Sequence, residues 1–265
     1  MSEQPGSATP PAAIELREVT VASMRDASLN VVEAVNWSVL PGEFWVIGGQ
    51  QYSGKSDLLM LAAGLMHPAA GTCRIFGFET GSFGEAQLAE RLRVGFVFQG
   101  GQLFNRLTVA ENIALPLCYQ KNLTMAEATQ AVGGWLEVME LAPFAEMTPS
   151  SVAAGWRHRT ALARALVLKP ELLLLDNPLS GFSPRHRQWL LQFLDRLWHG
   201  HELFDGRPVT IAVTTDDLRP WQNPRRKFAL LHEKKFTAIG PWAELERTDH
   251  PTVKELMAEL VETQN

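Results

Sequence analysis

Apolar and polar positions alternate in two distinct ways along this chain. Residues 14–21 and 31–39 alternate almost one by one, as half-buried strands do. Four further runs are mostly apolar and indicate buried strands: residues 44–48, 92–98, 171–176 and 209–214. Because helical segments separate these runs, the pattern predicts an α/β fold with a parallel-sheet core.

Helices are expected in the segments between the strands. Thr108 and Glu111 form a capping-box start for a helix over residues 112–119. The other expected elements are helices over residues 56–64, 125–139, 156 onward, 184–199 and 251–262, a short strand at 73–76, and a hairpin of residues 228–232 and 235–240. The helices between residues 100 and 159 interrupt the strand pattern, so we expect them to form a helical insert.

The pattern divides the chain into three parts. Residues 1–13 are polar and rich in Pro, Ser and Ala, which predicts a flexible tail. Residues 14–250 are expected to form one domain, with a helical subdomain at about residues 100–159. Residues 251–265 are expected to form a C-terminal helix.

Composition excludes several classes of protein. Hydrophobic residues make up 46% of the 265 residues, enough for a substantial core, and the net charge of −5 offers no basic surface for nucleic acid. Cys73 and Cys118 lack metal-ligand spacing, and no apolar run reaches the ~20 residues of a membrane helix. The first residues lack the apolar core of a signal peptide. We therefore expect a soluble intracellular protein that reaches a membrane only through a partner.

The strongest motif follows the buried strand at residues 44–48. It is a G-x-x-x-x-G-K-[ST] phosphate loop made of Gly49, Gln50, Gln51, Tyr52, Ser53, Gly54, Lys55 and Ser56. Backbone N–H groups of the turn and of the next helix would surround the phosphates. Lys55 would reach the β and γ oxygens, and Ser56 would bind Mg²⁺. The motif predicts binding of ATP with Mg²⁺.

Further motifs follow the phosphate loop in a fixed order. They are VFQ at residues 97–99, LTVAEN at 107–112, ALARAL at 161–166, LLLLD at 172–176 and PLSG at 178–181. Together with the loop they resemble the nucleotide-binding subunit of ATP-binding cassette (ABC) transporters over residues 14–245. The resemblance implies a P-loop NTPase fold, that is, an ABC-type nucleotide-binding domain with a parallel-sheet core, an antiparallel β subdomain and a helical insert.

The resemblance also implies ligands and partners. ATP would be held by residues 49–57 and Gln99, and Mg²⁺ by Ser56, Gln99 and Asp176. A second nucleotide-binding subunit, identical or different, would pair head to tail with this chain. The surface around residues 100–108 would dock on a membrane permease, which would place the chain at the cytoplasmic face of the membrane. Residues 100–117 look most like those of importers and lipid-handling systems.

The two catalytic positions depart from the family pattern, so neither catalytic residue is intact. Asn177 stands where the family has the glutamate that orients or deprotonates the attacking water, and loss of a general base typically costs about 10²–10⁴-fold in rate. Asp216 stands where a histidine would bond the γ-phosphate. Because a carboxylate repels a phosphate, we expect ATP binding to be weakened.

The signature motif and the D-loop also depart from the pattern. Ala153 lacks the hydroxyl that would reach the partner's ATP, Trp156 adds bulk at the expected dimer surface, and only Gly155 of the motif is kept. Ser183 replaces the D-loop aspartate. One chain thus lacks both halves of the composite site, which argues against ordinary turnover at two sites.

The nucleotide-binding side carries three changes. Tyr52 replaces a glycine, which costs on the order of 1–2 kcal/mol if its φ is positive. Asp57 replaces a threonine and adds negative charge beside the phosphates. No aromatic residue stands near Ser23 or Met24 to stack on the adenine, which would contribute about 1–3 kcal/mol.

Three hypotheses remain open at this point. The first is a degenerate ATP-binding subunit of an ABC transporter with little or no hydrolysis of its own. The second is a slow but working ATPase with an unconventional base, and the third is a soluble regulatory or scaffold protein that uses the same fold. Away from the site, we expect the charged run of residues 225–227 to be solvated and most of the eight tryptophans to lie in the core.

Overall fold

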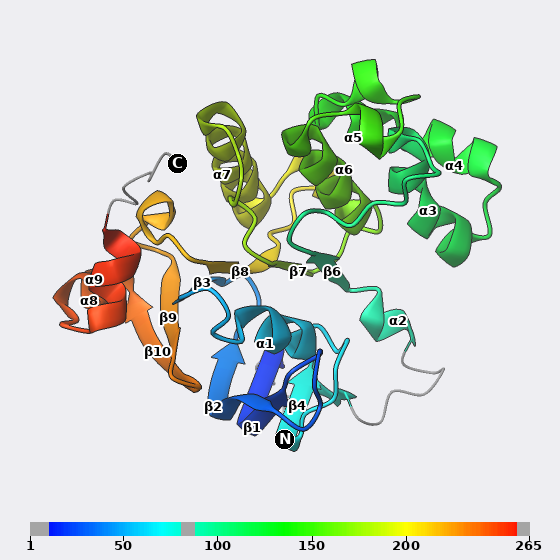
Figure 1. Ribbon diagram of the computed structural model, residues 1–265. Coiled ribbons are helices and arrows are strands. Elements are labelled where there is room, and N and C mark those ends of the chain that lie inside the picture. The colour runs from blue at the N-terminus through cyan, green and yellow to red at the C-terminus, as the bar shows by residue number, and fades with distance from the viewer. Residues whose placement is uncertain (1–10, 81–87, 259–265) are drawn as a thin grey trace, which may run out of the picture.

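The computed structural model describes residues 11–80 and 88–258 of the chain (Figure 1). The tail expected at residues 1–13 therefore lies mostly outside the described residues, as does the end of the helix expected at residues 251–262. Ala13 is fully buried, and its N–H donates to the carbonyl oxygen of Val39 at 2.7 Å. The packed domain thus includes residue 13.

One mixed sheet of ten strands runs through the described residues, in the order β5-β4-β1-β2-β10-β9-β3-β8-β7-β6. Its parallel core consists of β9 (Lys227–His232), β3 (Phe44–Gly49), β8 (Thr210–Thr215), β7 (Leu172–Leu175) and β6 (Val94–Val97). Antiparallel pairs join β1 (Ile14–Ala22), β2 (Asn30–Val39), β4 (Ala70–Ile75) and β5 (Phe78–Glu79), and a hairpin joins β9 to β10 (Lys235–Pro241). The predicted parallel core and antiparallel subdomain are confirmed.

Burial explains the two hydrophobic patterns. All residues of β3, β7 and β8 are buried, because these strands have neighbours on both sides and are covered on both faces. In β1, by contrast, buried and less buried positions largely alternate, with irregular register against β2 after Leu16. The period-2 pattern thus belongs to the antiparallel strands and the continuous pattern to the parallel core.

The helices lie in separate groups around the sheet (Figure 1). The first group is α1 (Lys55–Ala62) and α2 (Leu88–Arg91), beside the antiparallel strands. The green helical insert holds α3 (Val109–Lys121), α4 (Met125–Ala131), α5 (Gly133–Val138) and α6 (Ala154–Leu166). The remaining helices are α7 (Pro184–His199), which stands apart from the others, and the neighbouring α8 (Trp242–Arg247) and α9 (Pro251–Met257).

Two helix predictions need correction. The single helix expected over residues 125–139 is two helices, α4 and α5, because Val132 leaves the helical conformation at φ −92° and ψ 5°. Gly133 and Gly134 follow at once, and glycine is a weak helix former. Helix α8 was not predicted. The capping box of Thr108 and Glu111 is confirmed, although α3 begins at Val109 rather than at residue 112.

Two apolar clusters form the core. One lies between the parallel strands and the helices α3, α6 and α7, and the other lies between the antiparallel strands and α1. Five of the eight tryptophans are buried, which confirms that most of them belong to the core: Trp37, Trp45, Trp135, Trp198 and Trp221.

The charged run at residues 225–227 is not uniformly solvated. The side chain of Arg226 is only 2% exposed, and its Nη2 donates to Asp195 Oδ1 at 2.5 Å. Its guanidinium also lies 4.5 Å from the centre of the Phe44 ring. The prediction of solvated charge was wrong for Arg226, because the turn before β9 directs this side chain under α7, where Asp195 provides a counter-charge.

Candidate functional site

The ends of four parallel strands bring the predicted site residues to one edge of the sheet. The phosphate loop follows β3, Gln99 follows β6, Asp176 follows β7 and Asp216 follows β8. Open α/β sheets bind their ligands at this edge. A cavity of about 400 Å³ lies there, lined among others by Gln51, Tyr52, Ser53, Gly54, Lys55, Ser56, Asp57, Gln99, Asp176, Asn177 and Asp216.

The phosphate loop packs tightly at its first glycine. A Cβ atom on Gly49 would lie 2.7 Å from the carbonyl oxygen of Leu231, so only glycine fits against β9. Gly54 caps α1 with φ 93°, a conformation that favours glycine. Gly49 and Gln50 do not line the cavity. Their carbonyl oxygens instead accept hydrogen bonds from Lys55 Nζ at 2.7 and 2.6 Å.

Lys55 is the buried cation of the site. Burial lowers the pKa of its ammonium group to about 8, while the carboxylates of Asp216 and Asp176 partly oppose that shift. A bound phosphate would supply further negative charge and raise the pKa again. Lys55 is therefore suited to bind an anion most strongly when it carries its proton.

We expect nucleotide affinity to fall as the pH rises above about 8, by at most about tenfold per pH unit, since binding then requires Lys55 to take up a proton. Below that pH, Lys55 is expected to add no pH dependence to the affinity, because it already carries its proton. Calorimetric titration with MgADP between pH 7 and 9.5 measures this dependence. Lys55→Arg is the matched control, because a guanidinium stays protonated throughout. An equal pH dependence in both proteins would contradict the assignment to Lys55.

A short chain of hydrogen bonds joins the ends of β7 and β8. Thr214 Oγ1 donates to Asp176 Oδ1 at 2.7 Å and accepts from the N–H of Asn177 at 2.9 Å. The Asn177 Nδ2 donates to Asp216 Oδ2 at 3.2 Å. The two positions that depart from the catalytic pattern are therefore in direct contact.

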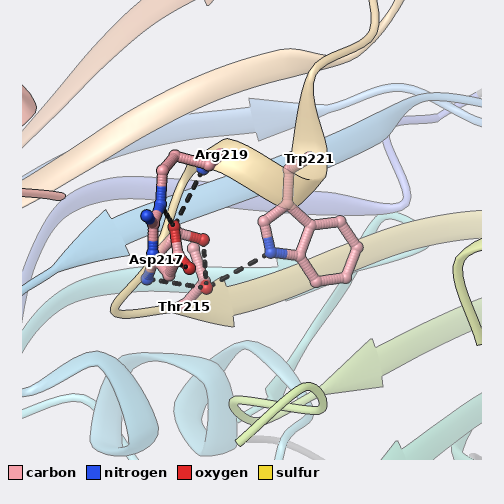
Figure 2. A network of polar contacts seen from close by, with 4 residues as sticks. All are labelled: Thr215, Asp217, Arg219 and Trp221. Carbon is pink, nitrogen blue, oxygen red and sulfur yellow. Dashed lines mark hydrogen bonds and ion pairs between the residues drawn. The ribbon is translucent and has the colours of Figure 1, made fainter. Parts of the chain in front are cut away.

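Asp216 is flanked by residues that hold the backbone after β8 in place. Figure 2 shows Thr215 Oγ1 accepting hydrogen bonds from the N–H of Asp217, at 3.1 Å, and from Trp221 Nε1, at 3.2 Å. The Arg219 guanidinium binds both oxygens of the Asp217 carboxylate, at 2.9 and 2.8 Å. Because Trp221 is fully buried, this network anchors the segment to the core.

Tyr52 is a strongly exposed residue of the phosphate loop with a left-handed backbone. Its φ is +64°, the positive value at which a non-glycine residue strains the backbone. Its side chain is 86% exposed. A side chain that is this exposed contributes little burial to offset the cost.

Tyr52→Gly is expected to raise the free energy of unfolding by about 0.5–1 kcal/mol, because relief of the left-handed strain exceeds the entropy cost of glycine. Chemical denaturation measures the change. Tyr52→Ala keeps the backbone strain and removes the ring, so it should show no such gain. Equal stability of the two variants would show that the backbone at residue 52 is not strained.

At the end of the cavity next to β1, the lining residues from positions 23 to 31 include no aromatic side chain. Ser23, Met24 and Arg25 line it beside Leu29 and Val31. Asp57 faces this end, where its Oδ1 accepts a hydrogen bond from the N–H of Met24 at 2.8 Å. Asp57 therefore ties the loop after β1 to helix α1, a structural role that its charge alone did not indicate.

The signature residues lie apart from this cavity, at the N-terminal end of α6. Ala153 is the N-cap of α6 and has no side chain that could cap it. Trp156 packs inward, with its ring centre 4.8 Å from Phe144 and 5.0 Å from His186. Trp156 is thus only partly exposed, and its expected role in adding bulk at a dimer surface stays a prediction. A Cβ on Gly155 would meet the ring of His186 at 2.4 Å, so a larger residue here would displace that ring.

Two contacts of the site were not foreseen. Thr214 bridges Asp176 and Asn177. In the sequence, this role could be suspected only from the presence of a hydroxyl within a buried apolar strand. Glu255 of α9 accepts a hydrogen bond from Gln50 Nε2 at 2.5 Å. No local motif marks Glu255, because the contact joins residues 205 positions apart.

The donor set around the cavity suits a nucleotide with its magnesium ion. The hydroxyl of Ser56, the amide of Gln99 and the carboxylate of Asp176 all line the cavity, and Mg²⁺ prefers such oxygen ligands together with phosphate and water. In the described ranges, no group of three or more His, Cys, Asp or Glu could hold a metal by itself. A cation here would therefore depend on the phosphates for part of its coordination.

The comparisons with known proteins agree on one family. The family model described as ABC transporter matches residues 32–180, more than half of the chain. The chain is 34% identical to a probable sulfate/thiosulfate import ATP-binding protein CysA of Chlorella vulgaris, covering 87% of this chain and 92% of that protein. It is 30% identical to the methionine import ATP-binding protein MetN 2 of Paraburkholderia xenovorans, covering 92% of this chain.

A solved structure supports the same assignment. The dimeric ATP-binding cassette MJ0796, bound to ADP and Pi, superimposes with a TM-score of 0.72 at 28% identity, covering 84% of this chain and 95% of that one. The chain belongs to the ABC transporter family and has the fold of its ATP-binding cassette. It spans 60% of the MetN 2 relative and 63% of a CysA relative from Thermosynechococcus vestitus, less than two thirds of either. Among the described residues, no helix combines the length and apolar character needed to cross a bilayer.

Proposed function

We propose that this chain is the ATP-binding subunit of an ABC importer and hydrolyses ATP much more slowly than an intact cassette. The observation that carries the first half is the convergence of Lys55, Ser56, Gln99 and Asp176 on one cavity. The relatives named above are ATP-binding proteins of importers, which supports the direction of transport. Because their names specify different substrates, sulfate or thiosulfate and methionine, the proposal does not extend to a substrate.

The weak hydrolysis follows from the chemistry of two positions. The amide of Asn177 can hold a water molecule but cannot accept its proton, and Asp216 brings a carboxylate toward the phosphate end of the cavity. In this arrangement the retained groups bind the nucleotide, while the catalytic pair supplies less than the family's glutamate and histidine do. The expected deficit is of the order that loss of a general base produces, about 10²–10⁴-fold.

Docking on a membrane permease is part of the proposal, with the segment at residues 100–108 as the contact surface. Phe104 is 56% exposed there, so its apolar ring is available to a partner. Buried Asn112 holds the backbone beneath it, accepting from the N–H of Phe104 at 2.9 Å and donating to its carbonyl oxygen at 3.0 Å. A rigid loop with an exposed aromatic residue suits a protein contact. Such docking would place the chain at the cytoplasmic face of the membrane, and a second nucleotide-binding subunit would complete the pair.

Nucleotide binding by the purified full chain tests this proposal. MgADP and MgATP are expected to bind, and Lys55→Ala is expected to weaken both by at least about tenfold, because a buried charge-assisted contact to phosphate is lost. The steady-state rate should stay well below ordinary ABC rates. Absence of binding at millimolar MgATP would overturn the proposal and favour a regulatory protein that uses the fold. Rapid turnover that Lys55→Ala abolishes would overturn the slow-hydrolysis half.

A further inference from the structure

The contact between Asn177 and Asp216 changes what the two substitutions mean together. Considered separately, each removes a catalytic group. In the structure, however, the carboxylate of Asp216 lies within hydrogen-bond distance of the side chain at position 177, with Nδ2 to Oδ2 at 3.2 Å. A carboxylate is thus still present beside the position from which the family's glutamate would act.

We infer that Asp216 supplies the carboxylate that accepts the proton of the attacking water, in place of the missing glutamate. The inference rests on the proposed binding of MgATP and adds a residue to that site. It follows from three properties of the pair: which atoms remain available, how firmly each residue is held, and which charge lies nearby.

The hydrogen bond determines which atoms remain available for water. An ionised carboxylate only accepts hydrogen bonds, so the amide nitrogen of Asn177 must face Asp216. This orientation leaves Asn177 Oδ1 and Asp216 Oδ1, neither of which has a hydrogen bond to any residue in the described parts of the chain. One water molecule can donate one hydrogen to each of these two oxygens, so the pair can both orient a water and accept a proton from it.

Both residues are held from behind. Asn177 is 9% exposed, adopts φ +43° and donates its N–H to Thr214. Asp216 lies between Thr215 and Asp217, whose network with Trp221 is shown in Figure 2, and the N–H of Leu218 donates to Leu256 at 3.0 Å. Positive φ in a non-glycine residue is a cost that persists where surrounding contacts impose it, often at functional sites. These contacts hold the backbone of both residues, and the hydrogen bond to Asn177 orients the exposed side chain of Asp216.

The nearby cation offsets the repulsion that argued against Asp216. Lys55 interacts electrostatically with Asp216 and Asp176 across the same cavity, so the carboxylate does not face the phosphates alone. Magnesium bound with the nucleotide would reduce the repulsion further. The charge of Asp216 still weakens ATP binding relative to a neutral residue. Removing this charge should therefore tighten binding and slow turnover at the same time.

The proposed step is the attack of water on the γ-phosphate, with Asp216 as the base. The water oxygen forms a bond to the γ-phosphorus as its proton passes to Asp216 Oδ1, and the bond from that phosphorus to the bridging oxygen breaks. The bridging oxygen leaves with its electron pair on ADP. Inorganic phosphate is the second product, and Asp216 then releases the proton to solvent.

Asp216→Asn tests the inference, because it removes the charge and keeps the shape. MgATP should bind about 3- to 10-fold more tightly, while the single-turnover rate with excess protein should fall by about 10²-fold. Glu202→Gln is the matched control: it removes one exposed negative charge far from the cavity and should change neither quantity. In Asp216→Ala, added formate should restore part of the turnover, which a purely structural role for Asp216 would not allow.

Each other result has a definite meaning. Tighter binding with unchanged or faster turnover in Asp216→Asn would overturn the inference, since Asp216 would then only repel the phosphate. Bound MgATP without measurable turnover in the unmodified protein would also overturn it and leave the proposed nucleotide binding intact. Absence of MgATP binding would overturn both. Slower turnover with tighter binding, together with rescue by formate, would support it.

Discussion

Asn177→Glu combined with Asp216→His is expected to raise the ATPase rate by at least about tenfold, whereas Asn177→Glu alone should give no gain. The single change would place a second carboxylate against Asp216, whose oxygen lies 3.2 Å from the present amide nitrogen. Two unit charges about 4 Å apart repel by about 4 kcal/mol at an effective dielectric constant of about 20. One of the two carboxylates would therefore take up a proton or turn away, and the new glutamate would not act as a base.

The double variant removes that conflict. A histidine at position 216 could donate to the glutamate or to the phosphate, as the resemblance to ABC cassettes implies. The gain is expected to remain below the full range of about 10²–10⁴-fold for a general base, because Ala153 still lacks the signature hydroxyl. Steady-state phosphate release measures the rates. Adding Lys55→Ala to the double variant should abolish the gain, which controls for contaminating ATPase. Full recovery by Asn177→Glu alone would contradict the interpretation of the pair.

Asp195→Ala is expected to lower the free energy of unfolding by about 2–3 kcal/mol. It would leave the buried guanidinium of Arg226 without its carboxylate. Removing one partner of a fully buried ion pair costs about 3–5 kcal/mol. Because Asp195 is 40% exposed, the expected value is lower. Burial lowers the pKa of Arg226, which shows the cost of enclosing this charge, and the carboxylate of Asp195 opposes the shift.

Two variants make the stability test specific. Asp205→Ala removes the exposed partner of Lys169, an ion pair at 3.2 Å, and should cost less than about 1 kcal/mol. The double variant Asp195→Ala with Arg226→Met should be more stable than Asp195→Ala alone, since no orphaned charge remains. Urea denaturation measures all three. A double variant that is less stable than the single one would show that packing of Arg226 against Phe44 outweighs its charge.

Local sequence was sufficient for the elements and for the anion-binding half of the site. The phosphate loop needs only a buried strand, a glycine turn and a helix start in succession, and residues 44–62 supply all three in order. The lack of an aromatic residue at positions 23 and 24 was likewise visible at once. The break between α4 and α5 was missed although Gly133 and Gly134 begin the second helix, because the apolar pattern continues across them.

Residue identities at fixed spacing were enough to predict the fold, the nucleotide loop and the departure from the family's glutamate and histidine. The three-dimensional arrangement was needed to show that Asn177 and Asp216 form one pair, that the Trp156 ring packs on His186 and that Arg226 is buried. Asn177 and Asp216 are 39 residues apart and meet because β7 and β8 lie side by side in the sheet. Contacts of this kind depend on strand order and packing, and no local pattern encodes them.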